Sequence, residues 1–438
     1  MSDPVAALLA AAAAHQAAGE LAAALDCCAR AVDLAPQDPE ALTALARAER
    51  GSGDLDAAID HFERALAAAP DAEVARLNLA AALDEAGETA RALALIDACD
   101  RLLAASAPAR WLAAPPVLRS GDLARGFALY EARWQLGGAA FAPRHAGTPR
   151  WDGAAAPGRS LLLWAEQGLG DTVQFIRFAR TAQARGLTVA AEVPRQLAAL
   201  VAGMPGIAQV HAPDATAPTC DLQLPLMSLP HVLGTTLDGL DGDAYLAAPA
   251  DRRAKWAGLL PATQARRIGL VWRSTILRDD ALVTQSKLAK SLPLAVLAPF
   301  ATLPATQLVS LQVGHGSEEI AGLPRGFRLA DPTAHIDDLA DTAAAIERCD
   351  LVVTIDTVVA HLAGALGKPV FVLLAHSPCW RWLAGRDDSP WYRAARLFRQ
   401  TVRNDWRAPV ATAAAAARDL PRRPAAGSSA WRRWFGAG

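Results

Sequence analysis

Two turns in the sequence carry residue types that could do chemistry. The first is Gly168-Leu-Gly170-Asp171, which follows a short apolar run from Leu161 to Trp164. This order predicts a buried strand, a tight turn and a helix that Asp171 caps. A helix start offers unpaired N–H groups and the positive end of the helix dipole to a ligand. The simpler alternative is a tight strand-to-helix turn in which Asp171 has only a capping role.

The second turn is Asp356-Thr357-Val358, with His361 three residues further on. Asp356 ends a predicted strand and Thr357 opens a predicted helix. His361 then lies about one turn into that helix, on roughly the same side as Thr357. A helix start with a hydroxyl and an imidazole suits a pyrophosphate. The alternative for His361 is a histidine that only fills the core.

The elements around these turns alternate between apolar runs and helical patterns. Such a βαβ order predicts parallel sheets with helices on both faces. Two series of this kind predict two Rossmann-like halves, with a ligand bound between them. The expected strands are 161–164, 187–193, 207–211 and 221–224 in the first half, and 267–272, 307–312, 351–355 and 370–374 in the second.

The first third of the chain is a repeat. Gly19, Gly53, Gly87 and Gly121 are spaced by 34 residues, and an acidic residue follows each of them. A 34-residue helix–turn–helix period is the tetratricopeptide signature. The segment 1–135 is therefore expected to be a stack of paired helices with equivalent glycine turns. Its concave face would bind a protein or peptide, although a scaffold surface without a specific ligand is the alternative.

Composition narrows the class of protein. The 438 residues are 52% hydrophobic and 20% charged with a net charge of −2, so no strong basic field points to nucleic acid. The six cysteines form no C-x-x-C pair, which favours reduced thiols in the cytoplasm. No uninterrupted apolar run reaches the ~18 residues of a membrane span. Asp3 is the wrong sign for a signal peptide.

Several segments together resemble bacterial tetratricopeptide-linked glycosyltransferases, which are similar to the lipopolysaccharide heptosyltransferase family. They are 166–175, 356–369, 380–382, 389–392 and 396–400. The resemblance implies an α + α/β chain: a tetratricopeptide superhelix followed by two Rossmann-like domains in a GT-B arrangement. It also implies an inverting transfer from a nucleotide-diphosphate sugar, with no metal and no further cofactor.

The resemblance assigns roles to individual residues. Gly168 and Gly170 form the family's turn, and Asp171 would be the base that takes the proton of the acceptor hydroxyl. In the second half, Asp356 would hold sugar hydroxyls, while Thr357 and His361 would hold the diphosphate.

The resemblance also implies a cation beyond the first strand of the second half, which would offset charge on the leaving diphosphate. Lys290 is the expected residue and Lys287 is its rival; a solvated charge run is the alternative for both. Two positions depart from the family pattern. Val358 stands where the family has glycine, and the stretch 273–285 lacks the usual loop rich in glycine and asparagine.

These observations predict five segments: a repeat domain at 1–136, a linker at 137–157, an acceptor-side domain at 158–255, a nucleotide-sugar-binding domain at 256–420 and a basic, aromatic tail at 421–438. The leading hypothesis is a cytoplasmic glycosyltransferase whose repeats present a protein acceptor. A transferase for a lipid-linked or lipopolysaccharide sugar, and a non-catalytic binding protein that kept the fold, are the alternatives. The tail either contacts an anionic membrane surface or packs on the protein.

Overall fold

The computed structural model describes residues 3–138, 142–215, 218–274 and 288–420. The chain divides into two compact units, which are described separately below. The first contains the N-terminal repeats together with Cys379–Ala384, and the second contains both α/β halves. Within the described ranges, no helix combines the length and the apolar character that crossing a lipid bilayer requires.

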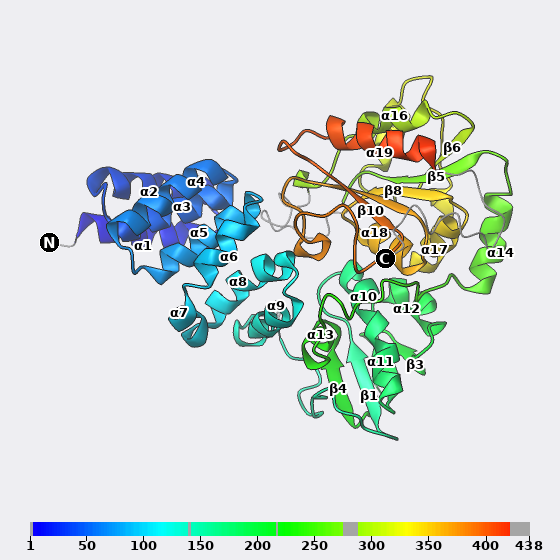
Figure 1. The fold of residues 1–438 in the computed structure, drawn as a ribbon, viewed down its shortest axis with the longest axis horizontal. Coiled ribbons are helices and arrows are strands. Elements are labelled where there is room, and N and C mark those ends of the chain that lie inside the picture. Colours follow the sequence, from blue (N-terminus) through cyan, green and yellow to red (C-terminus); the bar gives the residue numbers. More distant parts are fainter. Residues whose placement is uncertain (1–2, 139–141, 216–217, 275–287, 421–438) are drawn as a thin grey trace. The chain divides into compact units, whose positions relative to one another are not determined.

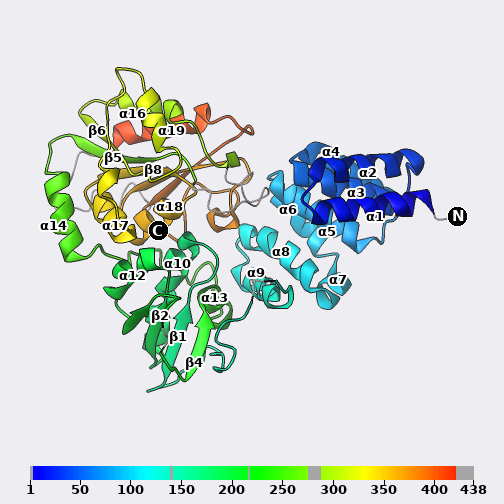
Figure 2. The same cartoon turned by 180° about the vertical axis from the view of Figure 1, so that it is seen from behind.

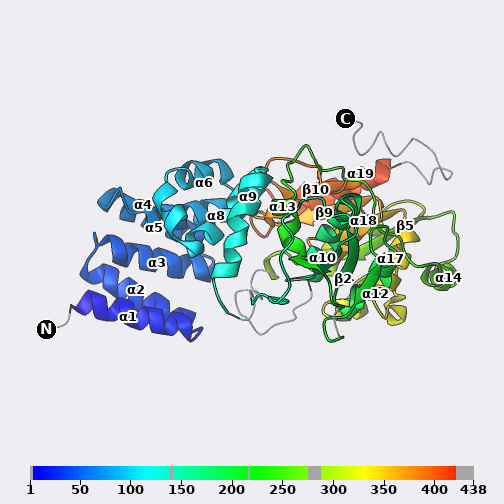
Figure 3. The same cartoon turned by 90° about the horizontal axis from the view of Figure 1, so that it is seen from below.

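The first unit is built from paired helices, as the 34-residue period predicts (Figure 3). Each repeat glycine follows the first helix of a pair and has a left-handed backbone, with φ of 76°, 93°, 88° and 98° at Gly19, Gly53, Gly87 and Gly121. The prediction of equivalent turns is therefore confirmed. The helices are α1 Pro4–Ala17, α2 Leu21–Leu34, α3 Pro39–Ser52, α4 Leu55–Ala68, α5 Glu73–Glu85, α6 Thr89–Ile96, α7 Asp100–Ala105, α8 Ala107–Ser120, α9 Leu123–Tyr130 and the 3₁₀ turn η1 Glu131–Gln135.

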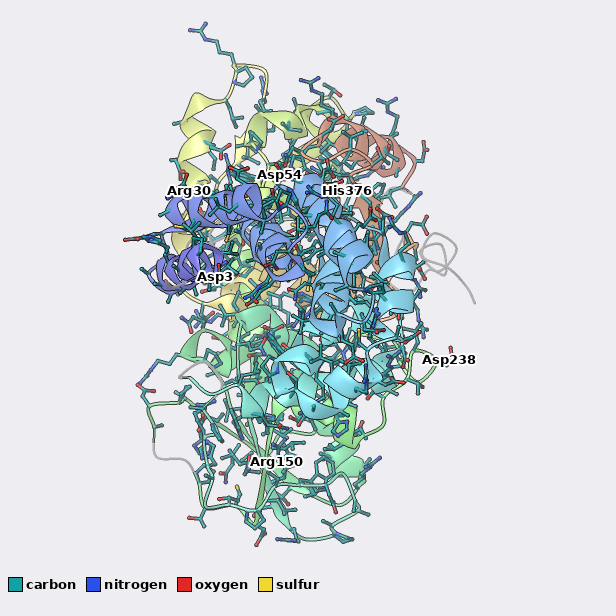
Figure 4. The ribbon with its side chains drawn as sticks, turned by 90° about the vertical axis from the view of Figure 1, so that its left-hand side faces the viewer. Asp3, Arg30, Asp54, Arg150, Asp238 and His376 are labelled. Atoms are coloured by element: carbon teal, nitrogen blue, oxygen red, sulfur yellow. The ribbon has the colours of Figure 1, made fainter. Side chains whose placement is uncertain are left out.

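Side-chain caps and small residues fix these helices. Asp3 accepts a hydrogen bond from the backbone of Val5 at the start of α1, and Asp54 accepts one from Ala57 at the start of α4 (both aspartates are labelled in Figure 4). Such caps stabilise a helix by roughly 1 kcal/mol. Gly126 in α9 allows close approach of α8, because a Cβ there would lie 2.6 Å from the side chain of Leu118.

A short segment from far along the sequence completes the last repeat. The 3₁₀ turn η8, Trp380–Trp382, packs on α8 and α9. The ring of Trp380 meets Phe127 edge-on, with the ring centroids 5.6 Å apart. The backbone N–H of Ala384 donates to the carbonyl of Arg119 at 2.9 Å. The first unit is therefore not one continuous piece of chain.

The first half of the second unit contains a parallel sheet of order β3-β2-β1-β4 in its described residues, and Figure 2 shows β2, β1 and β4 side by side. Segment 137–157, expected as a linker, is partly fixed to it: Trp151 is buried, and its backbone N–H donates to the backbone carbonyl of Gln223 in β4. The elements are β1 Ser160–Trp164, α10 Leu169–Phe175, η3 Ile176–Phe178, α11 Ala179–Ala184, β2 Thr188–Glu192, α12 Arg195–Ala202, β3 Gln209–His211, β4 Leu222–Pro225, η4 Leu226–Ser228 and α13 Leu229–Val232.

The second half contains a parallel sheet of order β10-β9-β8-β5-β6-β7 over the part of the chain described (Figure 1). The expected strands 351–355 and 370–374 are β8 and β9, whereas the sequence analysis did not predict β7, β10 and α19. The elements are α14 Ala250–Leu259, β5 Arg266–Val271, η5 Leu294–Leu297, α16 Ala298–Ala301, β6 Thr306–Ser310, η6 Ser317–Gly322, β7 Leu329–Ala330, η7 Thr333–His335, α17 Leu339–Glu347, β8 Leu351–Ile355, α18 Val358–Ala365, β9 Val370–Leu374, β10 Ala395–Arg399 and α19 Arg407–Asp419.

The boundary expected after residue 255 falls inside α14. This helix is tied to α17, since the indole N–H of Trp256 donates to Asp341 at 2.9 Å and Lys255 also contacts that carboxylate. Asp341 is fully buried. These contacts favour a boundary before Ala250.

Candidate active site

The first turn lies between β1 and α10, at the carboxyl end of the sheet. Gly168 is the cap residue, and Asp171 is the third residue of the helix. The carboxylate of Asp171 accepts a hydrogen bond from the backbone N–H of Gly168 at 2.8 Å. The expectation that Asp171 stands at the helix cap is corrected: it reaches back from the first turn to the cap residue, as the acid of a capping box does. This bond fixes the direction of the carboxylate.

The backbone strain of this turn lies at Gln167 rather than at a glycine. Gln167 has φ of 60°, in the left-handed region that side-chain-bearing residues rarely adopt. Gly168 has φ of −98°. The glycine at 170 serves a different purpose: a Cβ there would lie 2.9 Å from Cδ2 of His361. Gly170 therefore allows α10 of the first half to meet α18 of the second, and these two helices are in contact.

The second turn follows β8 and opens α18. Thr357 is the cap residue, and its hydroxyl accepts from the N–H of Val359 at 3.3 Å. Val358 is the first residue of the helix and is not among the residues with positive φ. Valine at this position therefore costs no backbone strain, and the departure from glycine changes only the side chain near the helix start.

Lys290 and Asp356 form an ion pair. Lys290 Nζ lies 3.6 Å from Asp356 Oδ2, and the side chains are 28% and 12% exposed. Because the pair is partly shielded from water, its attraction is stronger than that of a fully exposed pair. The structure thus joins the residue expected to hold sugar hydroxyls to the one expected to offset diphosphate charge. The rival Lys287 and most of the departing stretch 273–285 lie outside the described residues, as does the tail 421–438.

His361 is enclosed by residues from both halves. It is 4% exposed, Gly170 lies against its ring, and its Nδ1 lies 2.9 Å from the hydroxyl of Tyr392. The imidazole and the phenol rings are edge-on with centroids 5.7 Å apart. A buried imidazole with a fixed partner on one nitrogen can present only its other nitrogen to a ligand. This geometry fits either a core histidine or a residue aligned for one specific contact.

Two segments match known families. Residues 49–111 match the tetratricopeptide repeat, and residues 321–403 match glycosyltransferase family 9 (heptosyltransferase). The second match includes β8, α18 and Tyr392. The chain carries tetratricopeptide repeats and a glycosyltransferase family 9 domain.

Individual proteins and solved structures are similar to parts of this chain or to most of it. Protein FlbA of Caulobacter vibrioides is 27% identical over 338 residues, which cover 66% of this chain and 52% of FlbA. The chain thus spans about half the length of that relative. The E. coli ADP-heptose lps heptosyltransferase II structure is 15% identical, covering 59% of this chain and 98% of its own, with a TM-score of 0.45. The Thermobaculum terrenum O-GlcNAc transferase mutant is 15% identical and covers 99% of this chain and 94% of its own, with a TM-score of 0.36.

Sequence reasoning gave no role to Tyr392, inside the family 9 segment, or to Arg177, outside it. Tyr392 was noted only within a similar motif, and Arg177 was not singled out. The signal for Arg177 was present, because it interrupts the apolar residues Ile176 and Phe178 of a buried helix. A lone arginine in such a run indicates a buried polar partner.

Proposed function

We propose that this protein is a glycosyltransferase that moves a sugar from a nucleotide-diphosphate sugar to a protein acceptor. The family 9 match over 321–403 supports the donor class. The observation that carries the proposal is the contact between Gly170 on α10 and His361 on α18. It brings together two helix starts that each follow a parallel strand, the position where α/β proteins bind ligands.

The chemistry proposed for this site is a single displacement without a metal. Asp171 takes the proton of the acceptor hydroxyl, and the acceptor oxygen attacks the anomeric carbon of the sugar. The bond from that carbon to the diphosphate oxygen breaks on the opposite face, so the configuration inverts. Asp356 holds sugar hydroxyls, Thr357 and His361 hold the diphosphate, and Lys290 offsets its charge.

The repeats are the proposed acceptor-binding element. Tetratricopeptide arrays present extended concave surfaces that suit peptide segments, and this array is built from regular paired helices. We also propose a cytoplasmic location, because all six cysteines are free thiols and free thiols persist in reducing compartments.

The alternative acceptor is a lipid-linked or lipopolysaccharide sugar. The description of the matched family as heptosyltransferase favours it. In that case the repeats would serve assembly rather than acceptor binding. The two hypotheses predict the same donor half and differ in what receives the sugar and in what the repeats do.

The test begins with calorimetry of the full chain against ADP, UDP and GDP. Binding of one of them is expected, and Lys290→Met should weaken it about tenfold, the effect of losing one charged hydrogen bond. Lys255→Met is the matched control, because Lys255 is similarly exposed and also pairs with aspartates, Asp337 just before α17 and Asp341 within it. Its affinity should equal that of the wild type.

Transfer is then followed by mass spectrometry with sugars of the preferred nucleotide. A sugar added to a protein captured by residues 1–138 within the full chain supports the first hypothesis. A sugar added only to a lipid-linked acceptor supports the alternative. A wild-type chain that binds no nucleotide refutes both, and favours a binding protein in which Val358 blocks the donor site.

A further inference from the structure

Arg177 is a buried cation at the contact between the two α/β halves. It belongs to η3, directly after the helix that carries Asp171, and is 9% exposed. Its Nη2 donates to the carbonyl of Trp391 at 2.8 Å, and its Nε donates to the carbonyl of Gln174 at 3.1 Å. The guanidinium therefore joins its own helix to the segment before β10.

Two tyrosines flank the same guanidinium. The guanidinium carbon lies 4.5 Å from the ring centroid of Tyr245 and 5.0 Å from that of Tyr392. The hydroxyl of Tyr245 donates to the carbonyl of Val173 at 2.7 Å, whereas the hydroxyl of Tyr392 meets Nδ1 of His361. A planar guanidinium can contact aromatic faces in this way, and a lysine ammonium cannot reproduce that arrangement.

Tyr392 is closely packed against the helix of His361. It is 1% exposed, and a Cβ on Gly364 would lie only 2.3 Å from its ring. The phenol thus has Arg177 near one side, α18 on another and the imidazole at its hydroxyl. Little freedom remains for the ring to turn away from His361.

We propose that Arg177 and Tyr392 are positioning residues that hold His361 in one orientation and one tautomer. A phenol is a better donor than acceptor, so in this proposal the Tyr392 hydroxyl donates to Nδ1 and the ring proton stays on Nε2. The other nitrogen, Nε2, lies on the side of Gly170, 3.5 Å from where a Cβ on that residue would stand. The consequence for sugar transfer rests on the proposed function: the first half would set the alignment of a donor-side residue in the second.

The test reads the His361 tautomer directly. Full-length protein labelled with ¹⁵N at its histidines gives ring nitrogen signals that distinguish the two neutral tautomers and their mixtures. The His361 signal is assigned by its loss in His361→Gln. A single tautomer is expected in the wild type, and a mixture is expected in both Tyr392→Phe and Arg177→Lys.

Tyr245→Phe is the matched control. It also removes one hydroxyl beside Arg177 and keeps the ring, but the lost bond is to a backbone carbonyl and not to His361. Its His361 signals should match the wild type, although its melting temperature should fall as in Tyr392→Phe. Unchanged signals in Tyr392→Phe overturn the proposal, and unchanged signals in Arg177→Lys remove Arg177 from it.

Calorimetry with ADP and UDP separates this proposal from the proposed function. Tyr392→Phe and Arg177→Lys should each weaken nucleotide binding about tenfold, equivalent to one hydrogen bond. Their double variant should lose little more than either single one, because both act through His361. If the binding free energies lost in the two single variants add up in the double variant, Arg177 and Tyr392 do not both act through His361. Tautomer changes in a chain that binds neither nucleotide support the positioning of His361 and refute a role in donor binding.

Discussion

Gly170→Ala tests whether the contact between α10 and α18 is as close as described. The added Cβ would lie 2.9 Å from Cδ2 of His361, whereas carbon atoms in contact prefer about 3.5–4.0 Å. The imidazole must therefore move by at least about 0.6 Å to reach the lower end of that range. It cannot move freely, because it is 4% exposed and its other side meets Tyr392.

Two opposing effects set the magnitude. Overpacking of a buried contact costs about 1–3 kcal/mol. Alanine in place of a helical glycine returns about 0.5–1 kcal/mol, and Gly170 has no positive φ that would forbid the gain. The two ranges leave a net loss of unfolding free energy of roughly 0–2.5 kcal/mol, and we expect about 1 kcal/mol because the steric cost is the larger of the two.

Urea unfolding of the full chain, followed by tryptophan fluorescence, measures the change. Gly258→Ala is the control: Gly258 lies in α14 of the same unit, has no positive φ, and a Cβ there meets nothing within 4 Å. It should gain about 0.5–1 kcal/mol. If the two substitutions change the unfolding free energy equally, the steric argument is wrong.

Three further outcomes are expected. Asp171→Asn should keep nucleotide affinity and lower turnover by ~10²–10⁴, since the amide can still accept from Gly168 but cannot take a proton; an enzyme at full rate in the transfer assay would exclude Asp171 as the base. Burial alone would raise the pKa of Asp341, but hydrogen bonds from Trp256 and Lys255 outweigh it and lower the pKa below 3.8. The ionised Asp341 carboxylate therefore stabilises the fold above about pH 4, and this contribution is lost as the pH falls through the lowered pKa. Asp341→Asn should lower the unfolding free energy by about 1–3 kcal/mol at pH 7, and by progressively less in unfolding experiments at lower pH. Gly53→Ala should lower the melting temperature because φ is 93° there, and a thermal scan showing no change would contradict the assignment of the repeat turns.

The sequence was informative where a local pattern decides the structure. The repeat glycines were predictable because a left-handed residue is required once per helix pair. The strands β8 and β9 were predictable because Val370–Leu374 is a continuous apolar run and Leu351–Ile355 is apolar and β-branched apart from its leucine and Thr354, which is itself β-branched. Thr357 was correctly expected to open its helix, since hydroxyl residues cap helices through their own side chain.

Contacts between distant residues were not predictable. Arg177 and Trp391 are separated by 214 residues, and no local pattern indicates that they meet. The strand β10, Ala395–Arg399, was not predicted because two arginines interrupt its apolar residues. Asp171 was expected at the helix cap, whereas it is the third residue of the helix. An aspartate beside glycines fits both positions, so the sequence did not distinguish them.

The return of Cys379–Ala384 to the repeat helices has a consequence for anyone who wishes to exchange binding specificity between related proteins. A fragment cut after the N-terminal helices would lack Trp380 and lose its edge-on ring contacts with Phe127 and Tyr130. A repeat array transferred to another protein would lose the same ring contacts unless Cys379–Ala384 were transferred with it. Recombination that keeps the protein foldable must therefore exchange two separated stretches of the gene at once, which makes the repeats less interchangeable than their regular sequence implies.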